Sequence, residues 1–114
     1  MDTELFVAAI RRYVRDAAVE DVIGKLKSPP GRRVLPDKKA KSDWFNGLSE
    51  ANALHVQHVV EDAVDEAIFG LFAVLDGSRT ICEGRFDLTY AGAKQVLLND
   101  PDKIGLNEVF NAAD

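Results

Sequence analysis

The sequence predicts a mainly helical α+β fold, and three patterns along the chain lead to this prediction. The stretch from Leu48 to Gly77 begins as a two-faced helix and becomes apolar on every side before it ends. Near the N-terminus, apolar residues recur at spacings of three and four, which is the helical period. After Gly77 the period changes to two, as in strands. We expect a long central helix packed by an N-terminal helix and a short C-terminal helix, with a small antiparallel β-hairpin.

Length and composition favour a single domain over residues 1–114. Hydrophobic residues make up 46% of the chain and charged residues 29%, close to the average of globular domains. Cys82 is the only cysteine, which excludes an internal disulfide. The first residues mix charges with apolar side chains, unlike a secretory leader, and the longest uncharged apolar run, residues 67–75, is about half of a bilayer crossing. We expect a cytoplasmic protein without a membrane span or a cofactor.

The N-terminal helix is expected to begin at Asp2 or Thr3, because both side chains can accept a hydrogen bond from a free amide of the first turn. It either continues to about Lys27 or breaks near Ala18. Pro29 ends it in both cases, because proline lacks the amide donor and clashes with the preceding turn.

Residues 28–41 have the composition of a loop, with room for a short turn of helix before the aromatic pair Trp44 and Phe45. Both aromatic side chains are expected to pack back into the core. Leu48 and Ser49 then precede the central helix, and they fit a hydrophobic staple and an N-cap.

The central helix separates an apolar stripe from a polar side when it is projected at 100° per residue. Beyond Phe69 the helix is apolar all round, so this end is expected to be enclosed. Gly70 costs about 1 kcal/mol relative to alanine in a helix interior, and this predicts a close neighbour. The expected stripe consists of Ala53, Val56, Val60, Ala63, Val64, Ala67, Leu71 and Val74.

The length of this helix predicts a partner. Some 27 helical residues span about 40 Å, whereas a compact domain of this size has a diameter of roughly 34 Å. Either the polar half of the helix projects into solvent, or a partner covers part of it. A homodimer is the expected arrangement.

The C-terminal part is expected to contain two or three short strands and a final helix. Ile81, Phe86, Leu88 and Tyr90 alternate with polar neighbours, and a second apolar run spans residues 96–98. After Pro101, residues 103–111 have the pattern of a short helix.

Charge is distributed unevenly along the chain, whose net charge is −5. Residues 25–41 carry seven basic residues and one acidic residue, whereas residues 46–114 carry four basic and twelve acidic residues. The basic segment, with Arg32, Arg33 and Trp44, is a candidate interaction surface, although the overall charge disfavours nucleic acid as its partner. The acidic part could steer a basic protein partner, as in an inhibitor or immunity protein.

Four side chains of the central helix are the candidate metal ligands. His55, His58, Asp62 and Asp65 lie at i, i+3, i+7 and i+10, so they share one side of the helix. One helix places only two or three ligands around an ion, however, and no further ligand motif is present. A solvated acidic face is the favoured interpretation, and a metal site is the alternative.

Three segments of the chain resemble a family of small bacterial cytoplasmic proteins of unknown function. They are PPGR at residues 29–32, WFNGLS at residues 44–49 and DEAIFGLFAVLDGSR at residues 65–79. The similarity covers roughly residues 24–110. It implies a bacterial, cytoplasmic setting and brings no assigned activity or catalytic residue.

No catalytic motif accompanies these features, and the serines lack a nucleophile context. The sequence therefore favours a small non-enzymatic interaction or regulatory protein that binds a second copy of itself or another protein. Asp76 and Arg79, in the loop after the central helix, join Arg32, Arg33 and Trp44 as candidate contact residues. The alternative is a metal- or small-ligand-binding domain, or an enzyme, that uses the His55–Asp65 face or the Asp76–Arg79 loop.

Overall fold

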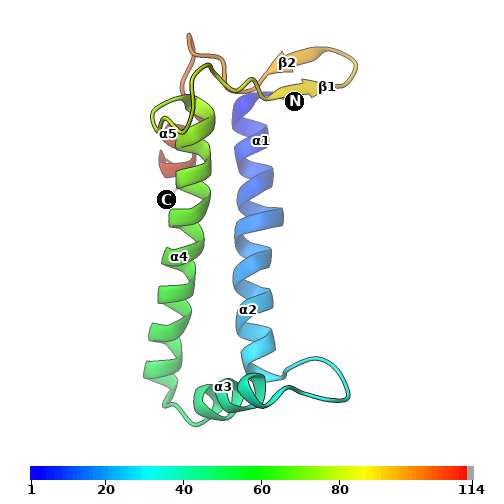
Figure 1. The fold of residues 1–114 in the computed structure, drawn as a ribbon, viewed down its shortest axis with the longest axis vertical. Coiled ribbons are helices and arrows are strands. Elements are labelled where there is room, and N and C mark those ends of the chain that lie inside the picture. Colours follow the sequence, from blue (N-terminus) through cyan, green and yellow to red (C-terminus); the bar gives the residue numbers. More distant parts are fainter. Residues whose placement is uncertain (113–114) are drawn as a thin grey trace.

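Two long antiparallel helical rods form the body of the protein (Figure 1). The computed structural model describes residues 1–112. The first rod is continuous and comprises α1 (Thr3–Ile10), the π-helical turn η1 (Arg11–Asp16) and α2 (Ala17–Lys27). The second rod is α4 (Glu50–Asp76). The N-terminal helix thus continues to Lys27, the first of the two expected alternatives.

The other elements lie at the two ends of the rods. At one end α3 (Pro36–Asn46) joins α2 to α4. At the other end are the strands β1 (Thr89–Ala91) and β2 (Gln95–Leu97) and the helix α5 (Leu106–Ala112), which packs against α1 and α4. The α+β, mainly helical fold is confirmed. No helix within residues 1–112 is long and apolar enough to cross a membrane.

The helix ends follow the capping residues that the sequence indicates. Asp2 accepts a hydrogen bond from the Leu5 amide at 2.8 Å, and Ser49 Oγ accepts one from the Asn52 amide at 3.2 Å. Gly77 ends α4 in the left-handed conformation, with φ of 82°. Each of these three helix ends is therefore determined by a residue within one turn of it.

Two clusters of buried side chains hold the rods together. The cluster at the end with the strands consists of Val7, Ile68, Phe72, Leu106 and Phe110. The cluster at the α3 end consists of Val19, Ile23 and Phe45. Val64 packs against both clusters. The enclosed end of α4 therefore exists as expected around Phe72, although Leu71 beside it stays exposed.

The segment before α4 corrects two predictions. Residues 28–41 were expected to form a loop, but α3 begins at Pro36, a residue whose fixed φ suits the first helical turn. Phe45 is buried as expected, whereas Trp44 is 55% exposed and does not enter the core. In a helix, consecutive residues point about 100° apart, so only one of the two aromatic side chains can face the rods.

The loop end, which is the end of the molecule with β1, β2 and α5, has the expected two-stranded hairpin, but its first strand begins later and its final helix is shorter than expected. The sheet described here is the single pair β1–β2, in which Tyr90 lies opposite Val96. Ile81 and Phe86 lie in irregular backbone, where the Asn99 side chain, and not a strand, binds the carbonyl of Phe86. The last helix begins at Leu106 and not at Lys103.

Candidate functional site

The basic segment forms the α3 end of the molecule. A hollow of about 350 Å³ is lined there by Lys25, Arg33 and Lys38 together with prolines and Leu35. Arg32 is exposed beside it, and Trp44 projects from α3. The structure therefore brings the basic candidates to one end, as their proximity in the sequence requires.

Asp76 and Arg79 lie at the opposite end of α4 from this basic surface, because Asp76 is the last residue of the helix. Asp76 Oδ2 accepts a hydrogen bond from the Asn107 amide at 2.9 Å and so caps α5. The tip of the Arg79 side chain lies over Gly70, where an added Cβ would meet Arg79 Nη1 at 2.8 Å. The close neighbour predicted for Gly70 is therefore Arg79, and both candidates have structural partners within the chain.

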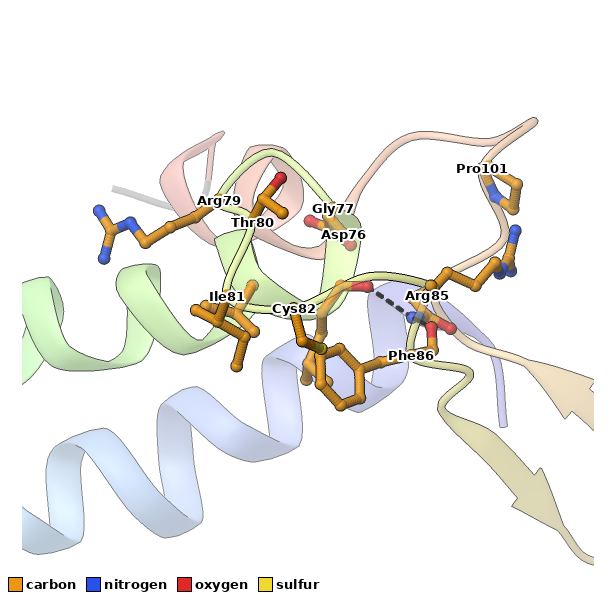
Figure 2. A pocket seen from close by; sticks show the side chains of 13 residues that line it. Asp76, Gly77, Arg79, Thr80, Ile81, Cys82, Arg85, Phe86 and Pro101 are labelled. Atoms are coloured by element: carbon orange, nitrogen blue, oxygen red, sulfur yellow. Dashed lines mark hydrogen bonds between the residues drawn. The ribbon is translucent and has the colours of Figure 1, made fainter.

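A small cavity of about 100 Å³ lies beside this loop. Cys82 and Phe86 line it, together with Arg79 and Arg85. Figure 2 shows the Arg79 and Arg85 side chains extending in opposite directions, so the two cations do not converge on one point. Arg85 instead pairs with Asp87 at 2.6 Å. The cavity thus lacks a focused binding group.

The histidine and aspartate side chains of α4 do not assemble into a metal centre in the described part of the chain. His55, His58 and Asp62 are exposed, and residues 1–112 contain no group of three or more acidic, histidine or cysteine side chains placed to hold an ion. Asp65 accepts hydrogen bonds from Arg15 Nε at 2.8 Å and from Arg15 Nη2 at 3.2 Å. Asp65 thus joins the two rods.

The Arg15–Asp65 pair is a fixed structural link. Hydrogen bonding to Asp65 is the main cause that raises the pKa of Arg15 above its ordinary value, and Asp16 adds to it. An arginine guanidinium is charged throughout the pH range in which proteins are handled, so the pair persists over that range. The Arg15–Asp65 pair thus occupies the Asp65 carboxylate of the candidate metal ligands, and His55, His58 and Asp62 remain exposed.

The remaining surface of the rods has two different flanks. On one flank of α4, residues that follow buried positions, such as Asp65 and Phe69, lie beside α5 and Asn111. On the other flank lie the residues that precede the half-buried Val60 and Val64 and the buried Ile68 and Phe72, and these residues are uncharged and apolar. They are Val59, Ala63, Ala67 and Leu71, all exposed.

Helix geometry places part of the first rod on the same flank. In two antiparallel helices, the residues that precede the buried positions of each helix fall on the same side of the pair. Ala18 and Val22 precede the buried Val19 and Ile23. Val14, four residues before Ala18, continues their line and is exposed.

We call these seven residues the open flank. In Figure 1, α5 passes behind α4, and no helix or strand crosses the middle of the two rods on the near side. The open flank consists of Val14, Ala18, Val22, Val59, Ala63, Ala67 and Leu71.

The open flank corrects the expected apolar stripe. The sequence projection took the stripe from Ala53 to Val74 as the buried face of α4. In the structure, the side chains that pack with the first rod are Val64, Ile68 and Phe72. Ala63, Ala67 and Leu71 were expected inside and lie outside. The hydrophobic pattern identifies all apolar positions around α4. The position of the first rod determines which of these positions are buried.

Comparisons with protein-family models, with curated proteins and with solved structures found no match for this chain. The functional argument therefore rests on the surfaces described above.

Proposed function

We propose that this chain is a small non-enzymatic interaction protein that acts by docking another protein chain on its open flank. One observation supports the proposal most directly: a line of uncharged apolar side chains runs along both rods, and within residues 1–112 all of them except the half-exposed Ala18 are exposed. Val59 is 65% exposed and Leu71 is 58% exposed. Contiguous exposed apolar surface of this kind marks interaction sites on monomeric chains.

The composition of the open flank favours a protein partner over a small ligand. Ligand sites are concave and carry a few converging polar groups, whereas this surface is the side of two straight rods with valine, alanine and leucine. Alanines at residues 63 and 67 allow another helix to approach closely, and the valines and leucine supply apolar area. A helical partner laid along the rods fits this surface best.

The proposed setting is the bacterial cytoplasm, and the resemblance of residues 29–32, 44–49 and 65–79 supports it. In this setting the basic α3 end and the acidic loop end would assist encounter with charged partners, since exposed charges change association rates more than affinities. The inhibitor or immunity role belongs to this proposal as its more specific form.

The test compares two alanine-to-glutamate variants of the same helix. Ala67→Glu places a charge on the open flank, and Ala51→Glu places the same charge at an exposed position of the first turn of α4, outside the open flank. Immobilised wild-type chain and Ala51→Glu should retain the same proteins from a bacterial extract, and Ala67→Glu should lose them. Purified partner and chain are then mixed in a titration to measure the affinity directly.

The expected loss is at least 100-fold, about 3 kcal/mol, because a charge buried without a partner in an apolar interface costs several kcal/mol. Retention of the same proteins by Ala67→Glu, with unchanged affinity, would contradict the proposal. Circular dichroism of both variants confirms that the helices are intact before binding is compared.

A further inference from the structure

We infer that a second copy of this chain covers the open flank, and that the two copies pack with their rods antiparallel to form a four-helix bundle. This inference rests on the proposed function, and it names the occupant of the docking surface. Three observations carry it: the excess surface of the single chain, the match of the open flank to itself, and the charges at the two ends of the rods.

The single chain exposes more surface than its mass explains. Its accessible area is 8206 Å², whereas a compact monomer of 12.5 kDa exposes about 6,200 Å². Its radius of gyration is 18.0 Å, against about 13 Å for a compact domain of this length. The excess of roughly 2,000 Å² is larger than the area of about 800 Å² that each partner buries in a standard interface.

The open flank offers a copy of itself an uncharged line of side chains, and the Arg79 side chain, whose tip lies over Gly70 next to Leu71, is a cation at its edge. All seven of its side chains are valine, alanine or leucine, and the charged residues of α4 lie on its other sides. A two-fold interface brings the same patch together from both copies, so a patch of one chemistry is complementary to itself. Two layers of two helices each then give the packing of a four-helix bundle, with alanines between bulkier residues.

Charge at the ends of the rods selects the relative direction of the copies. The α3 end, residues 25–50, carries seven basic and three acidic residues. The opposite end, residues 1–10 and 71–112, carries four basic and eight acidic residues. With antiparallel rods, each basic end lies beside the acidic end of the other copy. With parallel rods the two basic ends would lie together and repel each other.

The antiparallel and the parallel arrangement of the two copies also bring different helices into contact. A two-fold axis perpendicular to the rods lays α4 on α4 of the second copy, so that Val59 of one chain approaches Leu71 of the other. A two-fold axis parallel to the rods lays α4 on α2 of the second copy and brings Val59 to the level of Val22. Residues 59 and 71 lie about 18 Å apart along one helix, so cross-linking between them identifies contact between copies.

Sedimentation equilibrium and cross-linking test the inference together. At high micromolar concentration the wild-type chain and Ala51→Glu should sediment with twice the mass of one chain. Ala67→Glu should raise the dissociation constant of the dimer at least 100-fold, since each interface would bury two such charges. Val59→Lys, at a position that is mostly exposed in the single chain, gives a second disrupting variant that leaves the core unchanged.

Cross-linking is performed in a Cys82→Ser background, because Cys82 is exposed. A mixture of the Val59→Cys and Leu71→Cys chains should form disulfide-linked dimers faster than either chain alone. The mixture of Val59→Cys and Val22→Cys chains should not. Preferential linkage of positions 59 and 22 would overturn the antiparallel arrangement.

A monomeric wild-type chain at high concentration would overturn the second copy as the occupant. The proposed function would still stand if Ala67→Glu alone loses its protein partners in the binding experiment. If Ala67→Glu retains both its partners and the dimer, both proposals fail. The experiments therefore distinguish a failure of the proposed dimer from a failure of the proposed docking surface.

Discussion

Asn99 is the residue on which the loop end of the molecule depends most. Its side chain is 5% exposed and bonds to three backbone groups. The amide nitrogen donates to the carbonyls of Leu75 and Phe86, each at 2.7 Å, and the amide oxygen accepts from the Leu88 amide at 2.8 Å. One side chain thus joins the end of α4 to the irregular backbone that precedes β1.

Replacing Asn99 with alanine should lower the free energy of unfolding by about 3 kcal/mol, because three backbone groups lose their partner in a buried position. Urea unfolding followed by circular dichroism measures the change. Asn111→Ala, an exposed position on α5, is the control and should change the stability by less than about 0.5 kcal/mol. A loss below about 1 kcal/mol for Asn99→Ala would show that water replaces the amide group.

At the scale of elements, the π-helical turn η1 sets the register of the first rod. Val7 and Val19 are both buried against α4 or its neighbours, yet twelve residues of regular α-helix would place them 120° apart. The π-helical turn takes up one additional residue, which leaves the two directions about 20° apart. The two clusters can therefore share one side of the rod.

This register argument predicts opposite outcomes for two single-residue deletions. Deletion of Tyr13, an exposed residue of η1, should convert the turn to regular α-helix and cost about 1 kcal/mol or less, because both buried faces stay aligned. Deletion of Asp21, exposed in α2, should cost more than about 3 kcal/mol, because it rotates Ile23 by 100° away from Val19. Urea unfolding distinguishes the two.

Equal destabilisation by both deletions would contradict the role of η1 in the register. The measurement is performed with Ala67→Glu chains as well as with the wild type, so that self-association does not mask a difference in the stability of the single chain.

At the scale of the whole molecule, the elongated shape determines how the chain can be stabilised. The principal dimensions are 50 × 28 × 28 Å, and the buried clusters are small because a layer of two rods has little interior. Covering the open flank adds a second layer and encloses apolar side chains that a single copy leaves in water.

The melting temperature of the wild-type chain should therefore rise with protein concentration, by several degrees over a range of about 100-fold, because association stabilises the folded form by mass action. Ala67→Glu should melt at the same temperature throughout that range. Differential scanning fluorimetry or circular dichroism measures both. A wild-type melting temperature that is independent of concentration would contradict self-association.

Local interactions determine the ends of most helices of this protein, and these ends could be predicted from the sequence. Asp2, Ser49 and Gly77 define helix ends because each acts within one turn of its own position. The long run that begins amphipathic and becomes apolar predicted α4 correctly, and the proline pair predicted the end of the first rod. Gly70 indicated a close neighbour, since glycine in a helix interior is costly unless something occupies the space.

The tertiary structure alone decided which apolar residues are covered. Periodicity gives the width of an apolar arc but not the direction from which another helix packs, so Ala67 and Leu71 were expected inside and lie on the open flank. Trp44 was misplaced for the same reason, and the role of Asp76 as the cap of α5 depends on a residue 31 positions away. Burial is a property of pairs of elements, and a pattern within one element cannot identify its partner.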